Sequence, residues 1–235
     1  MGGGWRVLVA AAVVALGGLA APAAAETSYR NPVHDADFPD PFVLRTETGW
    51  FAYATHQGLA NIQIAYSADL VRWTAVGTAL PALPAWAEGP FVWAPSVLER
   101  DGGFVLYYSV RERASGLFCV SAATSAVPSG PFVDASAGPF VCQRERGGTI
   151  DPSPFVDTDG RAYLLYKSEG LAGREPTRIW SQPLRPDGLA LEGTPSELLV
   201  TALPWEEPII EAPSLTFADG RYHLLYSGGR WQTDG

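Results

Sequence analysis

The chain has 235 residues, of which 47% are hydrophobic and 17% charged, and its formal net charge at pH 7 is −9. This length suits one large domain or two small ones; we expect one, with a substantial buried core. The acidic balance excludes nucleic acid and anionic membranes as natural partners, because both are negatively charged, and it is compatible with a neutral ligand such as a sugar.

Residues 1–25 have the features of a secretory signal peptide. Arg6 is the only charged side chain, an apolar run covers residues 7–19, and three alanines precede Glu26. The apolar run is shorter than the roughly 20 residues that cross a bilayer. We therefore expect residues 26–235 to form a secreted, extracellular domain with no membrane partner.

A repeat of roughly 55–60 residues runs through the rest of the chain. Each unit begins with an acidic or aromatic residue close to a proline. The four unit starts are Asp40-Pro41-Phe42-Val43, Trp93-Ala94-Pro95-Ser96-Val97, Asp151-Pro152-Ser153-Pro154-Phe155 and Glu211-Ala212-Pro213-Ser214-Leu215. Repeats of this length are typical of β-propeller blades, so we predict an all-β propeller.

A glycine turn and an aromatic-rich strand follow each unit start. The turns are Thr48-Gly49, Asp101-Gly102-Gly103, Asp159-Gly160 and Asp219-Gly220, and the strands are expected at 50–55, 104–110, 162–167 and 222–227. Further strands at 62–67 and 118–124 give about four strands per unit. The alternative is an antiparallel sandwich, which has similar turns but does not need a long-period repeat.

The only two cysteines, Cys119 and Cys142, lie 23 positions apart. In an exported protein thiols tend to be oxidised, so we expect one disulfide between neighbouring strands. The three histidines, His34, His56 and His223, lack the spacing of metal ligands, and no metal site is expected.

Three unit starts carry an acid, namely Asp40, Asp151 and Glu211. The first strand of every propeller blade lines the central channel, so these side chains should converge there. Hydrolysis of a glycosidic bond needs an acid for the leaving oxygen and a carboxylate that activates water or attacks the sugar. A single Asp before a proline is more often a turn residue. Recurrence at unit starts, among apolar neighbours, favours the catalytic reading.

Trp93 takes the place of the acid in the second unit and should face the same channel. Its ring would stack on the apolar face of a sugar, or it would serve only as core packing. We leave both readings open.

The ordered set of motifs resembles glycoside hydrolase family 43. The motifs are NPVHDADFPDPFVL from Asn31, FVWAPSV from Phe91, GGTIDPSPFVD from Gly147 and IIEAPSL from Ile209. The resemblance extends from about Asn31 to the end of the chain. It implies a five-bladed β-propeller that cleaves arabinose- or xylose-containing plant cell-wall polysaccharides, as an α-L-arabinofuranosidase, an arabinanase or a β-xylosidase.

The same resemblance assigns roles to the acids. Asp40 would be the general base, Glu211 the general acid, and Asp151 the residue that keeps the acid protonated and oriented. Inversion of configuration would follow, with base and acid on the order of 6.5–9.5 Å apart. No cofactor is required, and the intact enzyme can hold a structural calcium. The alternative is a non-catalytic carbohydrate-binding propeller, which would keep Trp93 but would not need three channel acids.

The chain length differs from that family pattern. Five blades would need about 285 residues at this repeat length, and 210 follow the signal peptide. We therefore expect a C-terminally incomplete propeller of about three and a half blades. The histidine that the last blade of the family contributes has no counterpart here.

Overall fold

The computed structural model describes residues 1, 29–100 and 102–230. The chain divides into the units Met1–Arg30 and Asn31–Gly235, and all described strands belong to the second. Apart from Met1, the predicted signal peptide lies outside the described residues. No helix in the described part of the chain has the length and apolar character needed to cross a membrane.

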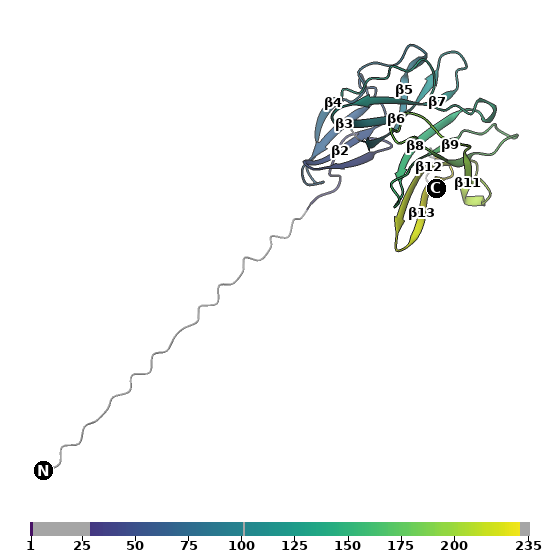
Figure 1. Ribbon diagram of the computed structural model, residues 1–235. Helices are drawn as coiled ribbons and strands as arrows, with labels where there is room; N and C mark the ends of the chain where they lie inside the picture. The colour runs from purple at the N-terminus through teal and green to yellow at the C-terminus, as the bar shows by residue number, and fades with distance from the viewer. Residues whose placement is uncertain (2–28, 101, 231–235) are drawn as a thin grey trace. The chain divides into compact units, whose positions relative to one another are not determined.

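The unit Asn31–Gly235 is all-β, with four antiparallel sheets that follow one another along the chain (Figure 1). Sheet 1 consists of β1 (Phe42–Thr46), β2 (Gly49–Ala54), β3 (Gln63–Ser67) and β4 (Thr74–Thr78); sheet 2 of β5 (Ala87–Arg100), β6 (Gly103–Glu112) and β7 (Phe118–Ser125); sheet 3 of β8 (Thr149–Val156), β9 (Ala162–Ser168), β10 (Arg178–Pro183) and β11 (Ser196–Val200); and sheet 4 of β12 (Ile210–Ala218) and β13 (Arg221–Gly228). Two short 3-10 helices, η1 (Arg144–Arg146) and η2 (Pro204–Glu206), are the only helices described.

The predicted hairpins and strands are confirmed. The four glycine turns join β1 to β2, β5 to β6, β8 to β9 and β12 to β13. The expected four strands per unit are found in sheets 1 and 3, whereas sheet 2 has three. In place of a fourth strand, the outer edge of sheet 2 forms only isolated bridges from β7 to Val133 and Val141. Prolines at 128, 131 and 139 explain this, because they lack the N–H that a continuous ladder requires.

Sheet 2 packs face to face against sheet 1 on one side and against sheet 3 on the other. In β6, Leu106 and Tyr108 face sheet 1, while Val105 and Tyr107 face sheet 3. Side chains alternate between the two faces of a strand, so a strand buried on both faces reads as a continuous apolar run. This explains why β6 has no polar alternation.

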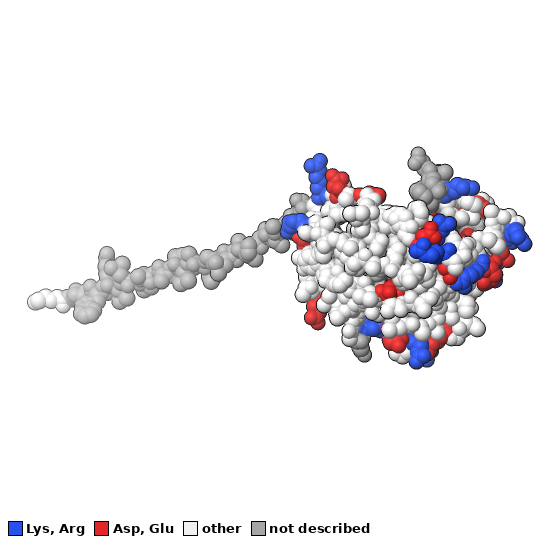
Figure 2. Space-filling model, turned by 90° about the horizontal axis from the view of Figure 1, so that it is seen from above, with Lys and Arg blue, Asp and Glu red and all other residues white. Residues whose placement is uncertain are grey.

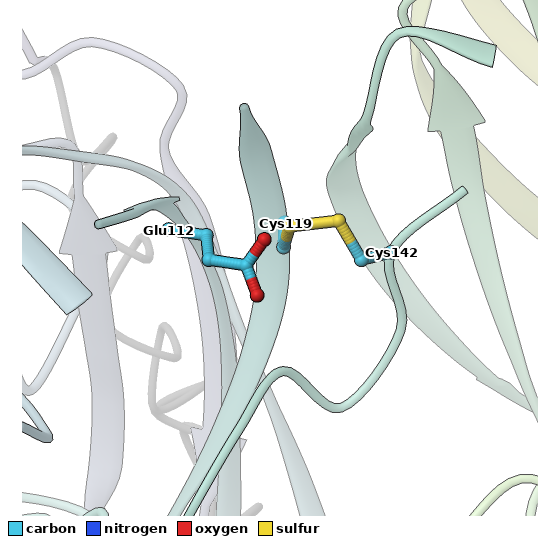
Figure 3. Close-up of side chains that lie close together, drawn as sticks. All are labelled: Glu112, Cys119 and Cys142. Carbon is cyan, nitrogen blue, oxygen red and sulfur yellow. A yellow bond between two sulfur atoms is a disulfide. The ribbon is translucent and has the colours of Figure 1, made fainter. Parts of the chain in front are cut away.

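The predicted disulfide between Cys119 and Cys142 is confirmed. The carboxylate of Glu112, at the end of β6, points toward it (Figure 3) and accepts two hydrogen bonds from the guanidinium of Arg144. Within the described ranges, these three residues are the only group of His, Cys, Asp or Glu close enough to share a metal ion. Because the sulfurs are bonded to each other and the carboxylate to Arg144, the group is structural.

Candidate active site

The same backbone feature, a left-handed residue directly before a proline, lies just before β1 and within β5, β8 and β12, the first strands of the four sheets. The residues are Asp40 (φ 51°), Ala94 (φ 45°), Asp151 (φ 55°) and Ala212 (φ 52°). In β5, β8 and β12 the pairing with the next strand shifts at this point, as in a β-bulge. Left-handed backbone is unfavourable for residues other than glycine, and bulges often lie beside functional sites, where they redirect a side chain. The site therefore begins with four equivalent backbone kinks.

The acids occupy two different positions relative to these kinks. Asp40 and Asp151 are equivalent, since each directly precedes its proline, but Glu211 lies one residue earlier and is equivalent to Trp93. The bulge accounts for the difference. It interrupts the regular alternation of side chains, so that side chains from two adjacent positions can point toward the same region.

The start of sheet 1 is tied to sheet 2. The hydroxyl of Thr55, which follows β2, donates a hydrogen bond to Oδ2 of Asp40 and accepts one of 2.9 Å from the N–H of Ala94. The N–H of the neighbouring His56 donates to the carbonyl of Val92 at 3.0 Å. Thr55 is buried, so the orientation of the Asp40 carboxylate depends on contact between the two sheets.

The starts of sheets 3 and 4 are connected in the same manner. Oγ of Ser109, in β6, accepts a 3.0 Å hydrogen bond from the N–H of Asp151. Oδ2 of Asp151 in turn accepts a 2.8 Å hydrogen bond from the N–H of Ala212, the residue that follows Glu211. Asp151 therefore fixes the backbone beside Glu211.

The environment of Asp151 favours its protonated form. Burial raises the pKa of Asp151 to about 6, and the negative charges of Glu211 and Asp40 act in the same direction. The charge of Lys167 and the Ala212 N–H oppose this rise. Because both other acids affect Asp151, the three predicted carboxylates share one electrostatic environment.

Lys167, in β9, is a site residue that the sequence analysis missed. Its Nζ lies 3.2 Å from Oε2 of Glu211 and 2.9 Å from Oε2 of Glu169. Burial lowers the pKa of Lys167, but the charges of Glu169, Asp151 and Glu211 outweigh this effect and the net pKa is raised. The available signal was that Lys167 is the only lysine in the chain and follows an apolar run.

Trp93 belongs to an aromatic cluster. Its ring stacks on Phe118 with centroids 3.9 Å apart, and Phe91 meets it edge-on at 6.1 Å. His56 lies edge-on to Phe91 at 6.0 Å, and Phe91 is exposed. One face of Trp93 is therefore packed against protein, while Phe91, which the sequence analysis did not single out, presents apolar surface to solvent.

Two neighbouring acids have local structural roles. The carboxylate of Glu206 accepts hydrogen bonds of 2.8 Å from the N–H groups of Ala202 and Leu203, and these bonds lower its pKa. Asp159 accepts a 2.9 Å hydrogen bond from the N–H of Arg161 in the β8–β9 turn. These contacts differ from the inter-sheet contacts of Asp40 and Asp151.

Charged residues on the surface are mixed in sign. On the face shown in Figure 2, basic and acidic side chains lie next to one another, and no continuous basic area is visible. Among the described residues, several cations form ion pairs; Arg146, for example, lies 3.0 Å from Glu175.

Comparisons with known proteins agree with this architecture. Residues 29–234 match the sequence model of glycosyl hydrolases family 43. An extracellular endo-alpha-(1->5)-L-arabinanase of Bacillus subtilis (strain 168) is 26% identical over 198 residues, which are 80% of this chain and 58% of that protein. A xylan 1,3-beta-xylosidase of a Vibrio species is 28% identical over 86% of this chain and 38% of its own.

Among solved structures, a thermostable family-43 glycoside hydrolase superposes with a TM-score of 0.77 at 28% identity. The match covers 87% of this chain and 68% of that one. The chain therefore spans less than two thirds of the length of the two enzymes named above.

Proposed function

Because the chain belongs to glycosyl hydrolases family 43, we propose that it functions as a secreted glycosidase. It hydrolyses O-glycosidic bonds in arabinose- or xylose-containing polysaccharides, with inversion of configuration. Support comes from the relatives of the chain, which include an arabinanase and a xylosidase. Arabinan is the first substrate to test. In this proposal the four sheets are blades of a five-bladed propeller.

The observation that carries the proposal is that three carboxylates from three sheets interact: the charges of Asp40 and Glu211 both act on Asp151, which is hydrogen-bonded beside Glu211. Asp40 acts as the general base that activates water, and Glu211 acts as the general acid that protonates the leaving oxygen. Thr55 holds Asp40, and the Asp151–Ala212 hydrogen bond holds the segment of Glu211. These hydrogen bonds fix the orientations of the base and the acid, so that water can attack the sugar as the leaving oxygen receives its proton.

Asp151 orients the acid and controls its charge. Two neighbouring carboxylates resist ionising together, so a proton is retained in the Asp151–Glu211 pair. The hydrogen bond from the Ala212 N–H to Asp151, beside Glu211, supports the orienting role. Trp93 forms a wall for the sugar with the part of its ring that is not stacked on Phe118.

A substrate panel tests the proposal. The complete protein should hydrolyse at least one of p-nitrophenyl α-L-arabinofuranoside, p-nitrophenyl β-D-xyloside and linear arabinan, and Glu211→Ala should abolish the activity. Proton NMR of the first-formed sugar should show the inverted anomer. Binding of arabinan without hydrolysis of any substrate would instead identify a carbohydrate-binding propeller.

Thr55 provides a test of how Asp40 is held. Thr55→Val removes the donor to Asp40 and the acceptor of the Ala94 N–H. A hydrogen bond to a charged group contributes about 1.5–3 kcal/mol, so kcat/KM should fall roughly 10- to 100-fold. Thr55→Ser keeps the hydroxyl and should retain most activity. An unchanged kcat/KM in Thr55→Val would contradict the role of the hydroxyl in holding Asp40.

A further inference from the structure

The chain uses lysine once. Of its 16 basic residues, 15 are arginines, and the exception is Lys167. Its side chain is 2% exposed, whereas Arg161, just before the same strand, is 75% exposed. Burial of an ammonium group is costly unless carboxylates compensate it. A single compact cation in this place indicates a specific electrostatic task.

Three carboxylates surround that ammonium group. Glu169, directly after β9, lies nearest at 2.9 Å, and Glu211 of β12 lies at 3.2 Å. Asp151 of β8 acts on Lys167 through its charge. Lys167 thus interacts electrostatically with three acids. Glu211 and Asp151 belong to the proposed catalytic set, whereas Glu169 has no role assigned so far.

We propose that Lys167 is a positioning residue that holds the Glu211 carboxylate, and that Glu169 is the counter-charge that regulates how firmly Glu211 keeps its proton. This inference rests on the proposed function. An ammonium group facing Glu211 alone would stabilise its ionised form, which cannot donate a proton. By binding Lys167 at the shorter distance, Glu169 takes up part of that charge.

The location of Glu169 suits this role. Its side chain is 28% exposed, and it lines a surface pocket together with Arg174, Glu207 and Arg230. Lys167 and Glu211, at 2% and 19% exposure, are more shielded. Solvent therefore reaches the counter-charge more readily than the pair that it regulates.

The inference predicts opposite effects from two substitutions. Lys167→Met removes the cation, so the acid keeps its proton to higher pH, and the basic limb of the pH–rate profile should move upward by about one pH unit or more. Glu169→Gln leaves the cation less compensated, so the basic limb should move downward. Lys167→Arg keeps the charge and should restore the limb toward its original position.

Arg161→Met is the matched control for charge. It removes one cation from the exposed end of the same hairpin and should leave the basic limb in place. Shifts in the same direction for Lys167→Met and Glu169→Gln, or no shift in either, would overturn the inference.

A second experiment is independent of catalysis. Carbon-13 label on the lysine side chain gives one NMR signal from residues 1–235, and its titration reports the pKa of Lys167 directly. The pKa should be raised in the natural chain and should fall in both Glu211→Gln and Glu169→Gln. If the pKa of Lys167 is the same in Glu211→Gln as in the natural chain, the positioning role is refuted, even when the natural chain hydrolyses glycosides. A lowered pKa in a protein that cleaves no glycoside would refute the proposed function instead.

Discussion

Replacement of Asp40 by Asn, or of Glu211 by Gln, should lower kcat on arabinan by roughly 100- to 10,000-fold without unfolding the protein. Both substitutions keep the shape of the side chain and remove its ability to exchange a proton. Asp40→Asn still offers Thr55 an oxygen acceptor. Unchanged circular dichroism spectra would establish that only the chemistry is affected.

The two variants should differ in their response to pH and to the leaving group. Asp40→Asn should lose the acidic limb of the pH–rate profile, because that limb reports ionisation of the base, and Glu211→Gln should lose the basic limb. Glu211→Gln should also retain more activity on p-nitrophenyl glycosides than on arabinan, since nitrophenolate leaves without a proton.

Asp37→Asn is the matched control for these acids. It removes the same charge from an exposed residue three positions before Asp40. Its kcat should remain close to that of the natural protein. A loss as large as that of Asp40→Asn would contradict the assignment of Asp40 as the base.

Substitution of Gly147 by Ala should reduce the free energy of unfolding by at least about 3 kcal/mol. Gly147 has φ 82°, and an added Cβ would lie 2.2 Å from the backbone carbonyl oxygen of Gly170. Neither side of this contact is a flexible side chain, so backbone must move. Gly147 leads into β8, and the movement should also displace Asp151 and lower kcat.

Gly160 supplies the control for backbone conformation. Its φ of 83° matches that of Gly147, but an added Cβ would meet nothing within 4 Å. Gly160→Ala should therefore cost only the left-handed penalty of about 1–2 kcal/mol. Urea unfolding of both variants separates the steric contact from the conformational penalty, and equal costs would show that the contact with Gly170 is relieved without strain.

The strands could be predicted because their signals are local. A glycine turn and an aromatic-rich run lie within a dozen residues of each other, and β2, β6, β9 and β13 all have both. The offset between Asp151, which directly precedes its proline, and Glu211, which lies one residue earlier, is visible in the sequence, whereas the β-bulge at each position appears only in the strand pairing. The catalytic roles and the count of five blades stay predictions.

Other site residues depend on contacts between sheets. Thr55 and Ser109 are ordinary strand residues in the sequence, and their importance arises only where another sheet brings an N–H to their oxygens. Lys167 carried a visible signal, since it is unique and follows an apolar run. Its partner Glu211 is 44 positions away, and such pairing over distance cannot be read from one sequence.

The hydrogen bonds between neighbouring sheets also follow the order in which the chain is synthesised. In three of them the oxygen belongs to the earlier sheet and the N–H to the later one, as with Thr55 and Ala94, Ser109 and Asp151, or Asp151 and Ala212. A ribosome makes the N-terminal part first, so each acceptor exists before its donor is synthesised. The growing chain can therefore dock one sheet at a time, and the set of acids becomes whole only when β12 has emerged.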